Sequence, residues 1–364
     1  MSYNIAIIGG GWYGAHLAWS LRNLGFGVRL FEQSGRLMNA ASGNNQFRLH
    51  MGFHYARHHG TRQQSREGFL RFVERYPTLS NPVENNIYAI PTRDSLIDFS
   101  TYKLIMASSG IDFVELRNIP EVLTNVDGAI LTPERVVMIS RARAFFMERL
   151  SDIVTFGRRV EHVTDLGHAI EVDGEPFDFA IDATWGHLAP LSIECSYEPT
   201  VLLYYETRES FPAITLVDGP LSSIYPTDDP NIYTLSSVTH TPLGSFSSPG
   251  LARNAQDRVT RTTIDAKRYE MEHQIHQNVP TFLERFRFVG VQLSMKTKPL
   301  GRSDDRSCYV EKRGRLLSVL SGKIDTVFHA TERILSHLGS SSTSHGTPES
   351  SELRADIQYS DGFQ

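Results

Sequence analysis

The chain has 364 residues, enough for two domains or one elaborate domain. Hydrophobic residues make up 40% of it and charged residues 21%, as is ordinary for a globular protein in water. Its 36 lysines and arginines are outnumbered by 41 acids, so a net charge of −5 gives no reason to expect a nucleic-acid partner.

The sequence also bears on the compartment. No apolar run approaches the roughly 20 residues of a membrane-spanning helix, so we expect no membrane span. The N-terminus enters a strand at once, without the basic region of a signal peptide. Only Cys195 and Cys308 are present, which argues against a disulfide framework and fits a reducing compartment. These features predict a cytoplasmic protein.

Residues 4–32 predict a strand, a glycine turn, a helix and a second strand that ends in an acid. The turn carries Gly9, Gly11 and Gly14 in the spacing Gly-x-Gly-x-x-Gly, and Glu32 closes the second strand. This is the full context that a dinucleotide fingerprint requires. The alternative is a glycine-rich turn in an ordinary βαβ unit.

Each residue of this motif has a chemical task. Gly9 permits the tight turn, Gly11 lets a pyrophosphate approach the backbone, and Gly14 lets the helix pack closely on the strand. The pyrophosphate then lies at the helix N-terminus, where free N–H groups and the dipole favour an anion. Glu32 lies where a carboxylate can accept ribose hydroxyls and would repel a 2′-phosphate. The motif therefore predicts FAD or NAD, and not NADP.

A polar segment over residues 34–60 follows, and four of the chain's 14 histidines fall within its last ten or so residues. We interpret it as a candidate functional loop. A helical pattern returns over 61–76 and ends at Pro77.

The middle of the chain predicts a second layer of structure. We expect strands at 86–90, 112–116 and 128–131. A helix from Asp94 to Ser109, with Asp94 as its cap, is predicted between the first two strands. A long helix over 133–150 is expected to have Pro133 in its first turn.

The second half predicts mostly strands. The expected elements are strands at 152–156, 160–164, 168–172 and 177–182, an antiparallel sheet over 199–240, a helix over 251–278, a strand over 288–298, a hairpin over 308–320 and a last helix over 325–338. The composition of residues 341–364 predicts a disordered tail.

This alternation of elements predicts an α/β fold. A Rossmann-like nucleotide-binding domain, for FAD or NAD, is expected at 1–77, 140–195 and 299–340. An antiparallel-sheet α+β substrate domain is expected to be inserted into it twice, at 78–139 and 196–298.

Five segments carry a family resemblance. They are the glycine turn with Glu32, the stretch Ala41–Tyr55, the segment Gly128–Val137, the turn Asp182–Gly186 preceded by Val160, and the loop Ser321–Thr326. Together they resemble the D-amino-acid-oxidase-like superfamily of FAD-dependent oxidoreductases, which includes glycine oxidase and sarcosine oxidase. The resemblance covers most of residues 3–338 and implies FAD as the cofactor.

The resemblance also implies which residues contact FAD. They are Gly9, Gly11, Trp12, Tyr13, Gly14, Glu32, Gln33, Ser42, Asn44, Asn45, Gln46, Arg48, Val160, Ala183, Thr184, Trp185, Gly322, Lys323, Ile324, Asp325 and Thr326. Glu32 is then expected to hold the adenosine ribose, and the C-terminal loop to contact the ribityl chain and flavin O2.

Two departures from the family pattern concern substrate and flavin chemistry. Where the family's amino-acid oxidases carry an Arg-Pro pair that grips the substrate carboxylate, this chain has Lys298-Pro299, with Arg302 nearby. Lysine offers a point charge and not a planar fork. Lys323 replaces part of a glycine-rich run and is expected to stabilise the reduced, anionic flavin. Lys298, Arg302 and His240 are predicted to face the substrate.

His50, His54, Lys323 and Tyr225 are the predicted catalytic residues. His50 and His54 share one face of an alternating stretch, so one pocket could receive both. Polar contacts beside the cofactor, a direct chemical role and covalent attachment of the flavin remain open for them. No metal is predicted, because Gly52 interrupts the stretch and no carboxylate is interleaved.

These residues together predict an FAD-dependent oxidoreductase. It would remove a hydride from a C–N bond of an amine or amino acid, or from a C–O bond, with flavin N5 as acceptor. The expected partners are a small-molecule substrate and dioxygen or another electron acceptor. The alternative is a non-catalytic flavin- or NAD-binding protein, in which the cofactor is structural or senses redox state.

Overall fold

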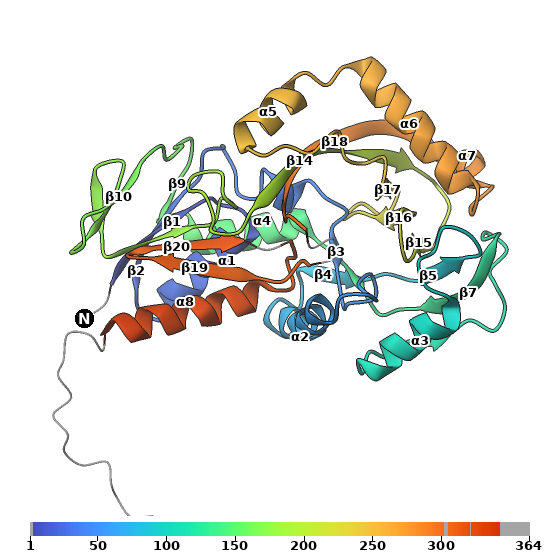
Figure 1. Ribbon diagram of the computed structural model, residues 1–364, viewed down its shortest axis with the longest axis horizontal. Coiled ribbons are helices and arrows are strands. Elements are labelled where there is room, and N and C mark those ends of the chain that lie inside the picture. The colour runs from blue at the N-terminus through green and yellow to red at the C-terminus, as the bar shows by residue number, and fades with distance from the viewer. Residues whose placement is uncertain (1–2, 302–304, 321, 343–364) are drawn as a thin grey trace, which may run out of the picture.

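The computed structural model describes residues 3–301, 305–320 and 322–342, which two large sheets organise (Figure 1). The first sheet has six strands. From edge to edge they are β19 (Tyr309–Arg313), β20 (Leu316–Leu320), β13 (Phe179–Asp182), β1 (Asn4–Ile8), β2 (Gly27–Phe31) and β9 (Val154–Thr155). The strands from β20 to β9 are parallel, and β19 joins the edge antiparallel to β20.

The start of this sheet has the predicted strand–turn–helix–strand order. Helix α1 (Trp12–Asn23) connects β1 to β2, and β1 pairs in parallel with both β2 and β13. The carboxyl ends of these strands therefore meet at one edge, which is where nucleotides bind in open parallel sheets. The predicted Rossmann-like α/β fold is confirmed.

The second sheet has eight strands from two separated stretches of the chain. In order they are β18 (Arg287–Pro299), β14 (Cys195–Glu206), β17 (Ile232–Ser237), β16 (Ser222–Pro226), β15 (Ala213–Leu216), β5 (Asn86–Pro91), β7 (Val126–Leu131) and β6 (Val114–Glu115). All neighbouring pairs are antiparallel except β15 and β5. This agrees with the predicted antiparallel sheet.

Two small sheets and the remaining helices complete the described structure. The small sheets are β10 (Val163–Asp165), β11 (Ile170–Val172) and β12 (Glu175–Phe177), and β3 (Arg48–Leu49), β8 (Arg135–Val137) and β4 (Ser80–Pro82). The helices are η1 (Ala41–Gly43), α2 (His59–Arg75), α3 (Phe99–Ser108), α4 (Ile139–Leu150), α5 (Pro249–Asp257), α6 (Arg261–His276), α7 (Phe282–Arg285) and α8 (Val327–Ser342). No described helix is long and apolar enough to span a membrane.

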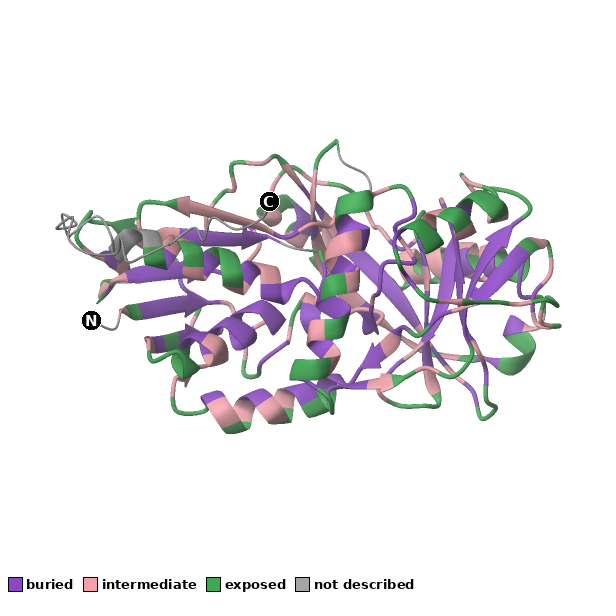
Figure 2. Cartoon of the chain, turned by 90° about the horizontal axis from the view of Figure 1, so that it is seen from below, coloured by how far each residue is buried: buried purple, intermediate pink, exposed green. Residues whose placement is uncertain are grey.

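The buried residues lie on the strands and on the inner faces of the helices (Figure 2). Beside the parallel sheet, the ring of Trp12 on α1 lies 5.2 Å from that of Phe72 on α2 and 5.6 Å from that of Phe146 on α4. In the second sheet, Met271 and Ile275 of α6 are fully buried in one apolar cluster with residues of β14 and β17. Helix α6 therefore covers one face of that sheet (Figure 1).

The helix predicted over 133–150 is wrong in its first part. Residues 135–137 form β8, which pairs with β3 and β4, and the helix begins only at Ile139. The β-branched pair Val136 and Val137 suits a buried strand, and pairing with β3 decides between the two states.

Two other predicted helices have different bounds. Helix α3 begins after Asp98, whose side chain accepts a hydrogen bond from Thr101 N, and Asp94 instead has φ +65° in the preceding turn. The helix predicted over 251–278 is two helices, because Thr260 caps a new helix by accepting from Thr263 N. The predicted tail lies outside the described residues from 343 onward.

The contact between α1 and the glycine turn gives a testable prediction. A Cβ added at Gly14 would lie 1.8 Å from the carbonyl oxygen of Gly9. We expect Gly14→Ala to lower the free energy of unfolding by about 1–3 kcal/mol or more, because the helix must move from the strand. The loss of stability is measured as a fall in melting temperature by thermal unfolding. Gly250→Ala is the control, because a Cβ there meets open space. Equal melting temperatures for the two variants would contradict the prediction.

Candidate active site

The turn between β1 and α1 is tightly built. Gly9 has φ +103°, a conformation that favours glycine, and Gly14 lets backbone meet backbone. Glu32, at the end of β2, accepts hydrogen bonds from Gly10 N at 2.7 Å and from Ser34 N at 2.8 Å. An ionised carboxylate has about four acceptor positions, so about two remain for the hydroxyl groups of a ligand.

The loop that follows β2 connects the two sheets. Ser42 Oγ accepts a hydrogen bond at 2.9 Å from the first backbone N–H of α1. On the other side, Gln292 Nε2 of β18 donates to Asn44 Oδ1 at 3.0 Å, and Ser223 Oγ of β16 donates to Gln46 Oε1 at 3.0 Å. The loop is therefore fixed between the helix N-terminus and the second sheet.

The C-terminal loop lies against the first helix. The hydroxyl of Tyr13 donates to the carbonyl oxygen of Lys323 at 2.7 Å and lies 2.8 Å from Thr326 Oγ1. A Cβ at Gly68 of α2 would lie 2.0 Å from the carbonyl oxygen of Asp325. Segments more than 300 residues apart in the sequence thus form one wall.

The turn after β13 completes the edge of the parallel sheet. Ala183 N donates to the carbonyl oxygen of Ile8 at 2.9 Å, which places this turn beside the glycine turn. Asp182 Oδ1 accepts from Thr184 N at 2.8 Å, and Trp185 has φ +59°. Within the described residues, the buried Trp185 Nε1 has no hydrogen-bond partner.

A fully buried carboxylate lies where the loop meets the second sheet. Glu134 is 0% exposed and accepts hydrogen bonds from Met51 N at 2.7 Å and from the Tyr88 hydroxyl at 2.6 Å. His50 Nδ1 lies 3.6 Å from its Oε1. Arg48 Nη1 donates to the Tyr88 hydroxyl at 3.1 Å. Burial opposes ionisation of Glu134, but His50, Arg48 and the Tyr88 hydrogen bond together lower its pKa.

The histidines beside this carboxylate are held neutral. Burial, with the charge of Lys323 adding to it, lowers the pKa of His50 to about 3, and burial lowers the pKa of His54 well below its usual value. Their ring centroids are 6.1 Å apart. Lys323 Nζ lies 4.3 Å above the Tyr55 ring, and burial lowers the pKa of its ammonium group. Burial raises the pKa of Asp325 to about 7, against the opposing effect of Lys323.

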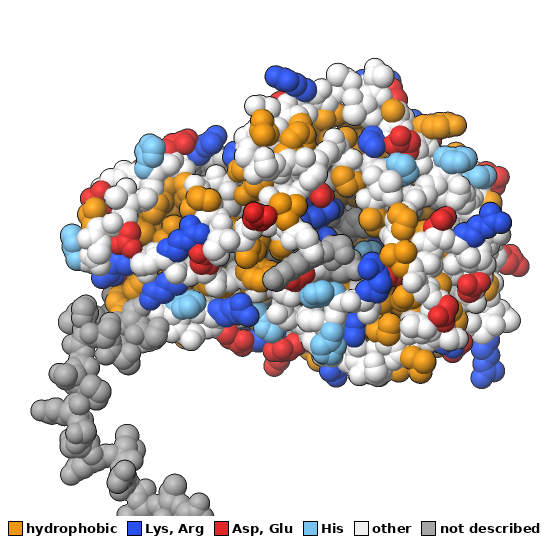
Figure 3. Space-filling view, viewed as in Figure 1, with side chains coloured by type: hydrophobic (Ala, Val, Ile, Leu, Met, Phe, Trp, Pro, Cys, Tyr) orange, Lys and Arg blue, Asp and Glu red, His pale blue; other side chains and the backbone are white. Residues whose placement is uncertain are grey.

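Strand β18 adds two lysines to this region. Alternate strand residues share a face, so Lys296 and Lys298 lie on the same face as Gln292, which contacts the 42–46 loop. Lys298 forms an ion pair with Glu198 of β14. Burial lowers the pKa of Lys296 to about 8. Figure 3 shows a hollow near the middle of the molecule, with Lys or Arg and His side chains beside it.

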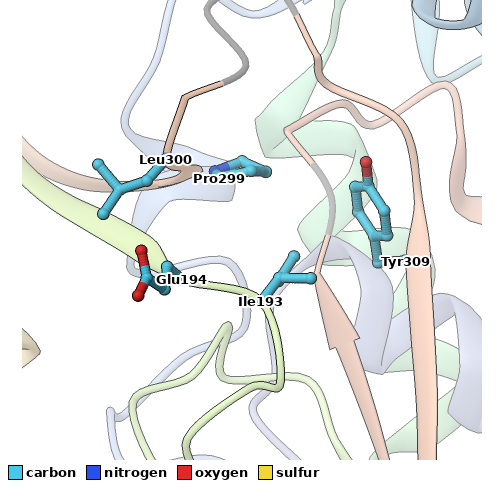
Figure 4. A pocket seen from close by; sticks show the side chains of 5 residues that line it. All are labelled: Ile193, Glu194, Pro299, Leu300 and Tyr309. Atoms are coloured by element: carbon cyan, nitrogen blue, oxygen red, sulfur yellow. The ribbon is translucent and has the colours of Figure 1, made fainter.

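Two cavities flank this region. One of about 160 Å³ lies where the ends of β14, β18 and β19 meet, and Figure 4 shows its lining residues, Ile193, Glu194, Pro299, Leu300 and Tyr309. The other, of about 260 Å³, is lined by residues that include Gly43, Phe47, Arg143 and Tyr204. Among the described residues, no three or more His, Cys, Asp and Glu side chains gather as a metal site.

Comparisons with known proteins agree with this geometry. Residues 7–72 match a family model described as an NAD(P)-binding Rossmann-like domain. The chain is 59% identical to "FAD-dependent monooxygenase FPY4" of Fusarium mangiferae, over 92% of this chain and 90% of that protein. The chain belongs to this family of FAD-dependent oxidoreductases.

Solved structures of other flavoproteins have a similar fold. Glycine oxidase from Geobacillus kaustophilus superposes with a TM-score of 0.71 at 15% identity, covering 93% of this chain and 95% of that one. L-α-glycerophosphate oxidase from Mycoplasma pneumoniae, solved with FAD bound, gives 0.70 at 11% identity, covering 93% and 94%. The resemblance to the D-amino-acid-oxidase-like superfamily is confirmed as a likeness of fold.

The residues of this flavoprotein fit FAD, its cofactor. A Cβ at Gly11 would lie only 3.2 Å from Ser42 Oγ. Because Gly11 has no side chain, the N-terminus of α1 stays open to a pyrophosphate. Glu32 has acceptor positions for ribose hydroxyls, and the indole N–H of Trp185 in the adjacent turn has no acceptor among the residues that the structure describes. These residues would hold the ADP half, and FAD supplies the redox chemistry when bound.

Most predicted cofactor residues lie at the carboxyl edge of the parallel sheet, but they differ in whether their side chains are accessible to a ligand. The side chain of Trp12 is fully buried among aromatic rings, so only its backbone faces the turn. Val160 is buried in an apolar cluster behind β2. Gln33 directly follows Glu32 at the end of β2, and Asn45 Oδ1 accepts from the N–H of the next residue.

The predicted substrate residues separate. His240 Nδ1 lies 3.1 Å from Glu270 Oε2 of α6, on the face of the sheet away from Gln292. Arg302 lies outside the described residues. Tyr225, predicted as catalytic, is buried against the Arg48 guanidinium, and its hydroxyl donates to the carbonyl oxygen of Arg135 at 3.2 Å.

The sequence interpretation missed Glu134 and Lys296. Glu134 was predicted to lie in a helix, and nothing in its neighbourhood indicates that Met51 N and the Tyr88 hydroxyl surround it. Lys296 carried a usable signal, because Gln292, Ser294 and Lys296 alternate with the apolar Leu293 and Met295 along one predicted strand.

The tie between α1 and the C-terminal loop gives a second prediction. Tyr13→Phe keeps the ring but removes the hydroxyl that donates to the Lys323 carbonyl and lies beside Thr326 Oγ1. We expect FAD to bind roughly tenfold more weakly, because the loop loses its anchor. Titration of the apoprotein with FAD, followed by flavin fluorescence, measures this. Tyr269→Phe, at a residue that is 72% exposed, is the control. Unchanged affinity in Tyr13→Phe would show that the hydroxyl does not support the site.

Proposed function

We propose that this flavoprotein oxidises a C–N or C–O bond of a small metabolite by hydride transfer to flavin N5. His50 is the acceptor of the proton that the substrate nitrogen or oxygen must lose. The observation that supports this most directly is the fully buried Glu134 carboxylate, whose Oε1 lies 3.6 Å from Nδ1 of His50.

An imidazole accepts a proton readily only where its protonated form is stabilised, because the best general base has a pKa near the working pH. Glu134 supplies that stabilisation: its carboxylate lies 3.6 Å from Nδ1 of His50 and raises the pKa of the ring, against burial and the charge of Lys323, which lower it. His54 lies beside His50 and is also neutral, so it can pass a proton within the same pocket.

The proposed reaction balances. The substrate C–H bond breaks and its electron pair leaves as hydride, while the N–H or O–H proton goes to His50. The carbon becomes doubly bonded to nitrogen or oxygen. Bound FAD supplies the hydride acceptor, and dioxygen or another acceptor restores it.

Monooxygenation is the second candidate, because the 59% identical relative is called a monooxygenase. The two reactions differ in what reduces the flavin and where oxygen goes. In the first, substrate alone reduces the flavin. In the second, an external reductant is needed and one atom of dioxygen enters the product.

Anaerobic addition of amines, amino acids and hydroxy acids to the holoenzyme tests the proposal. Bleaching of the flavin absorbance by one of these compounds alone is the expected result. Bleaching by NADPH or NADH alone, together with an oxygen atom from labelled dioxygen in the product, would favour monooxygenation over the proposed oxidation. Flavin that neither treatment bleaches would favour a structural or redox-sensing cofactor.

The role of His50 gives a third prediction. His50→Gln should slow anaerobic flavin bleaching by about 10²–10⁴-fold, because the substrate proton loses its acceptor. FAD content should stay unchanged. Stopped-flow absorbance measures the rate, and His168→Gln, at an exposed residue of a turn, is the control. A His50→Gln rate within a few fold of wild type would assign the proton to another group.

The place of Lys323 gives a fourth prediction. Lys323→Met should lower the flavin midpoint potential, because a cation stabilises the reduced, anionic ring. Burial lowers the pKa of this lysine, so its charge is present at acid pH and is lost as pH rises through that pKa. The difference between variant and wild type should therefore shrink with rising pH. Dye-equilibration titrations measure the potential.

Lys103→Met is the control for this measurement, because Lys103 lies on α3 and pairs with Glu115. Equal potentials for Lys323→Met and wild type at every pH would remove Lys323 from flavin tuning.

A further inference from the structure

The Arg48 guanidinium is buried with only part of its hydrogen-bonding capacity used. Its side chain belongs to a residue that is 7% exposed, and the guanidinium carbon lies 4.1 Å from the centre of the Tyr225 ring. Nη1 donates to the Tyr88 hydroxyl at 3.1 Å. Nε and Nη2 are buried and have no hydrogen-bond partner among the residues that the structure describes.

The two unused nitrogens form one edge of the guanidinium. Nε–H and one Nη2–H point the same way, and this two-donor edge matches the two oxygens of a carboxylate. An unpaired buried donor costs stability, and unpaired charged donors cost more. Their partner must therefore come from outside the described part of the chain.

The charge around this edge also favours an anion. Glu134 acts on the pKa of Arg48, but none of its oxygens accepts a hydrogen bond from Nε or Nη2. Lys323 and Arg306 both act on the pKa of His54, so they add positive charge to the same pocket. A bound anion would offset part of this charge.

The residue that the family pattern assigns to a carboxylate is already paired. Lys298 occupies the position of the family's carboxylate-gripping arginine, but it forms an ion pair with Glu198. Arg48 instead lies next to the histidines, because residues 48 and 50 lie on the same side of the extended segment and both approach Glu134.

We propose that Arg48 binds a carboxylate of the substrate through Nε and Nη2, so that the substrates of this enzyme are carboxylic acids. This rests on the proposed function of the same site. The sequence prediction placed Arg48 on the cofactor, whereas its contacts are with Tyr88 and Tyr225 of the second sheet. A carboxylate held there brings the rest of the substrate beside His50 and His54.

Calorimetric titration of the holoenzyme tests this without turnover. The probes are acetate and benzoate, each compared with its neutral amide. Wild type should bind the carboxylates and not the amides. Arg48→Lys should weaken carboxylate binding by roughly tenfold or more, because lysine keeps the charge but loses the fork. Arg135→Lys is the matched control, since its Nε and Nη2 are already bonded to Ser80.

Two results would overturn the proposal. One is equal binding of amides and carboxylates to wild type, which needs no variant. The other is unchanged carboxylate affinity in Arg48→Lys together with a shifted flavin spectrum or midpoint potential, which would assign the edge to the flavin. If Arg48→Lys does not fold, Tyr88→Phe removes the Nη1 anchor and should weaken carboxylate binding in the same direction.

The test separates this proposal from the proposed reaction. His50→Gln should keep its affinity for acetate and benzoate, because the histidine does not hold the carboxylate. Carboxylate binding without flavin bleaching by any acid would count against the reaction alone. Bleaching by uncharged amines or alcohols, with no carboxylate discrimination, would count against the role of Arg48 alone.

Discussion

The buried carboxylate of Glu134 connects the parts of the site. It accepts from a backbone N–H of the histidine loop and from a tyrosine hydroxyl of the second sheet, and it lies beside His50. Arg48 reaches it through the Tyr88 hydroxyl. Removing one member of a buried charged group leaves the others uncompensated, at a cost of about 3–5 kcal/mol. The position of the loop, and with it the histidines, therefore depends on this one acid.

The nucleotide end of the site could be predicted from the sequence because its determinants are local. The residues from Asn4 to Glu32 include the strand, the turn, the helix and the acid, and each needs only its neighbours to take its place. Close approach of α1 to the turn depends on Gly14, which the spacing alone indicates. The same holds for the hairpin of β19 and β20, where Gly314 has φ +55°.

The substrate end could not be predicted as well, because distant segments decide it. Residues 133–138 have a pattern that a helix start satisfies, yet Arg135–Val137 pair with β3 as a strand, directly after the buried Glu134. The helix prediction failed where strand partners nearly 90 residues away in the sequence supplied backbone hydrogen bonds. Local patterns contain no information on such partners. The spacing of His50 and His54 predicted that they share a pocket, but it did not indicate that the Glu134 carboxylate lies beside His50.

The same reasoning explains why a motif position does not identify a substrate contact. Lys298 stands where the family pattern expects a carboxylate grip, and its ion pair with Glu198 uses that charge within the protein. His240 is likewise engaged, by Glu270 on the outer face of the sheet. By contrast, Nε and Nη2 of Arg48 have no hydrogen-bond partner among the described residues. A ligand can lower the free energy of a buried group that still lacks a partner, so an unpaired charged donor such as the Arg48 edge influences what binds.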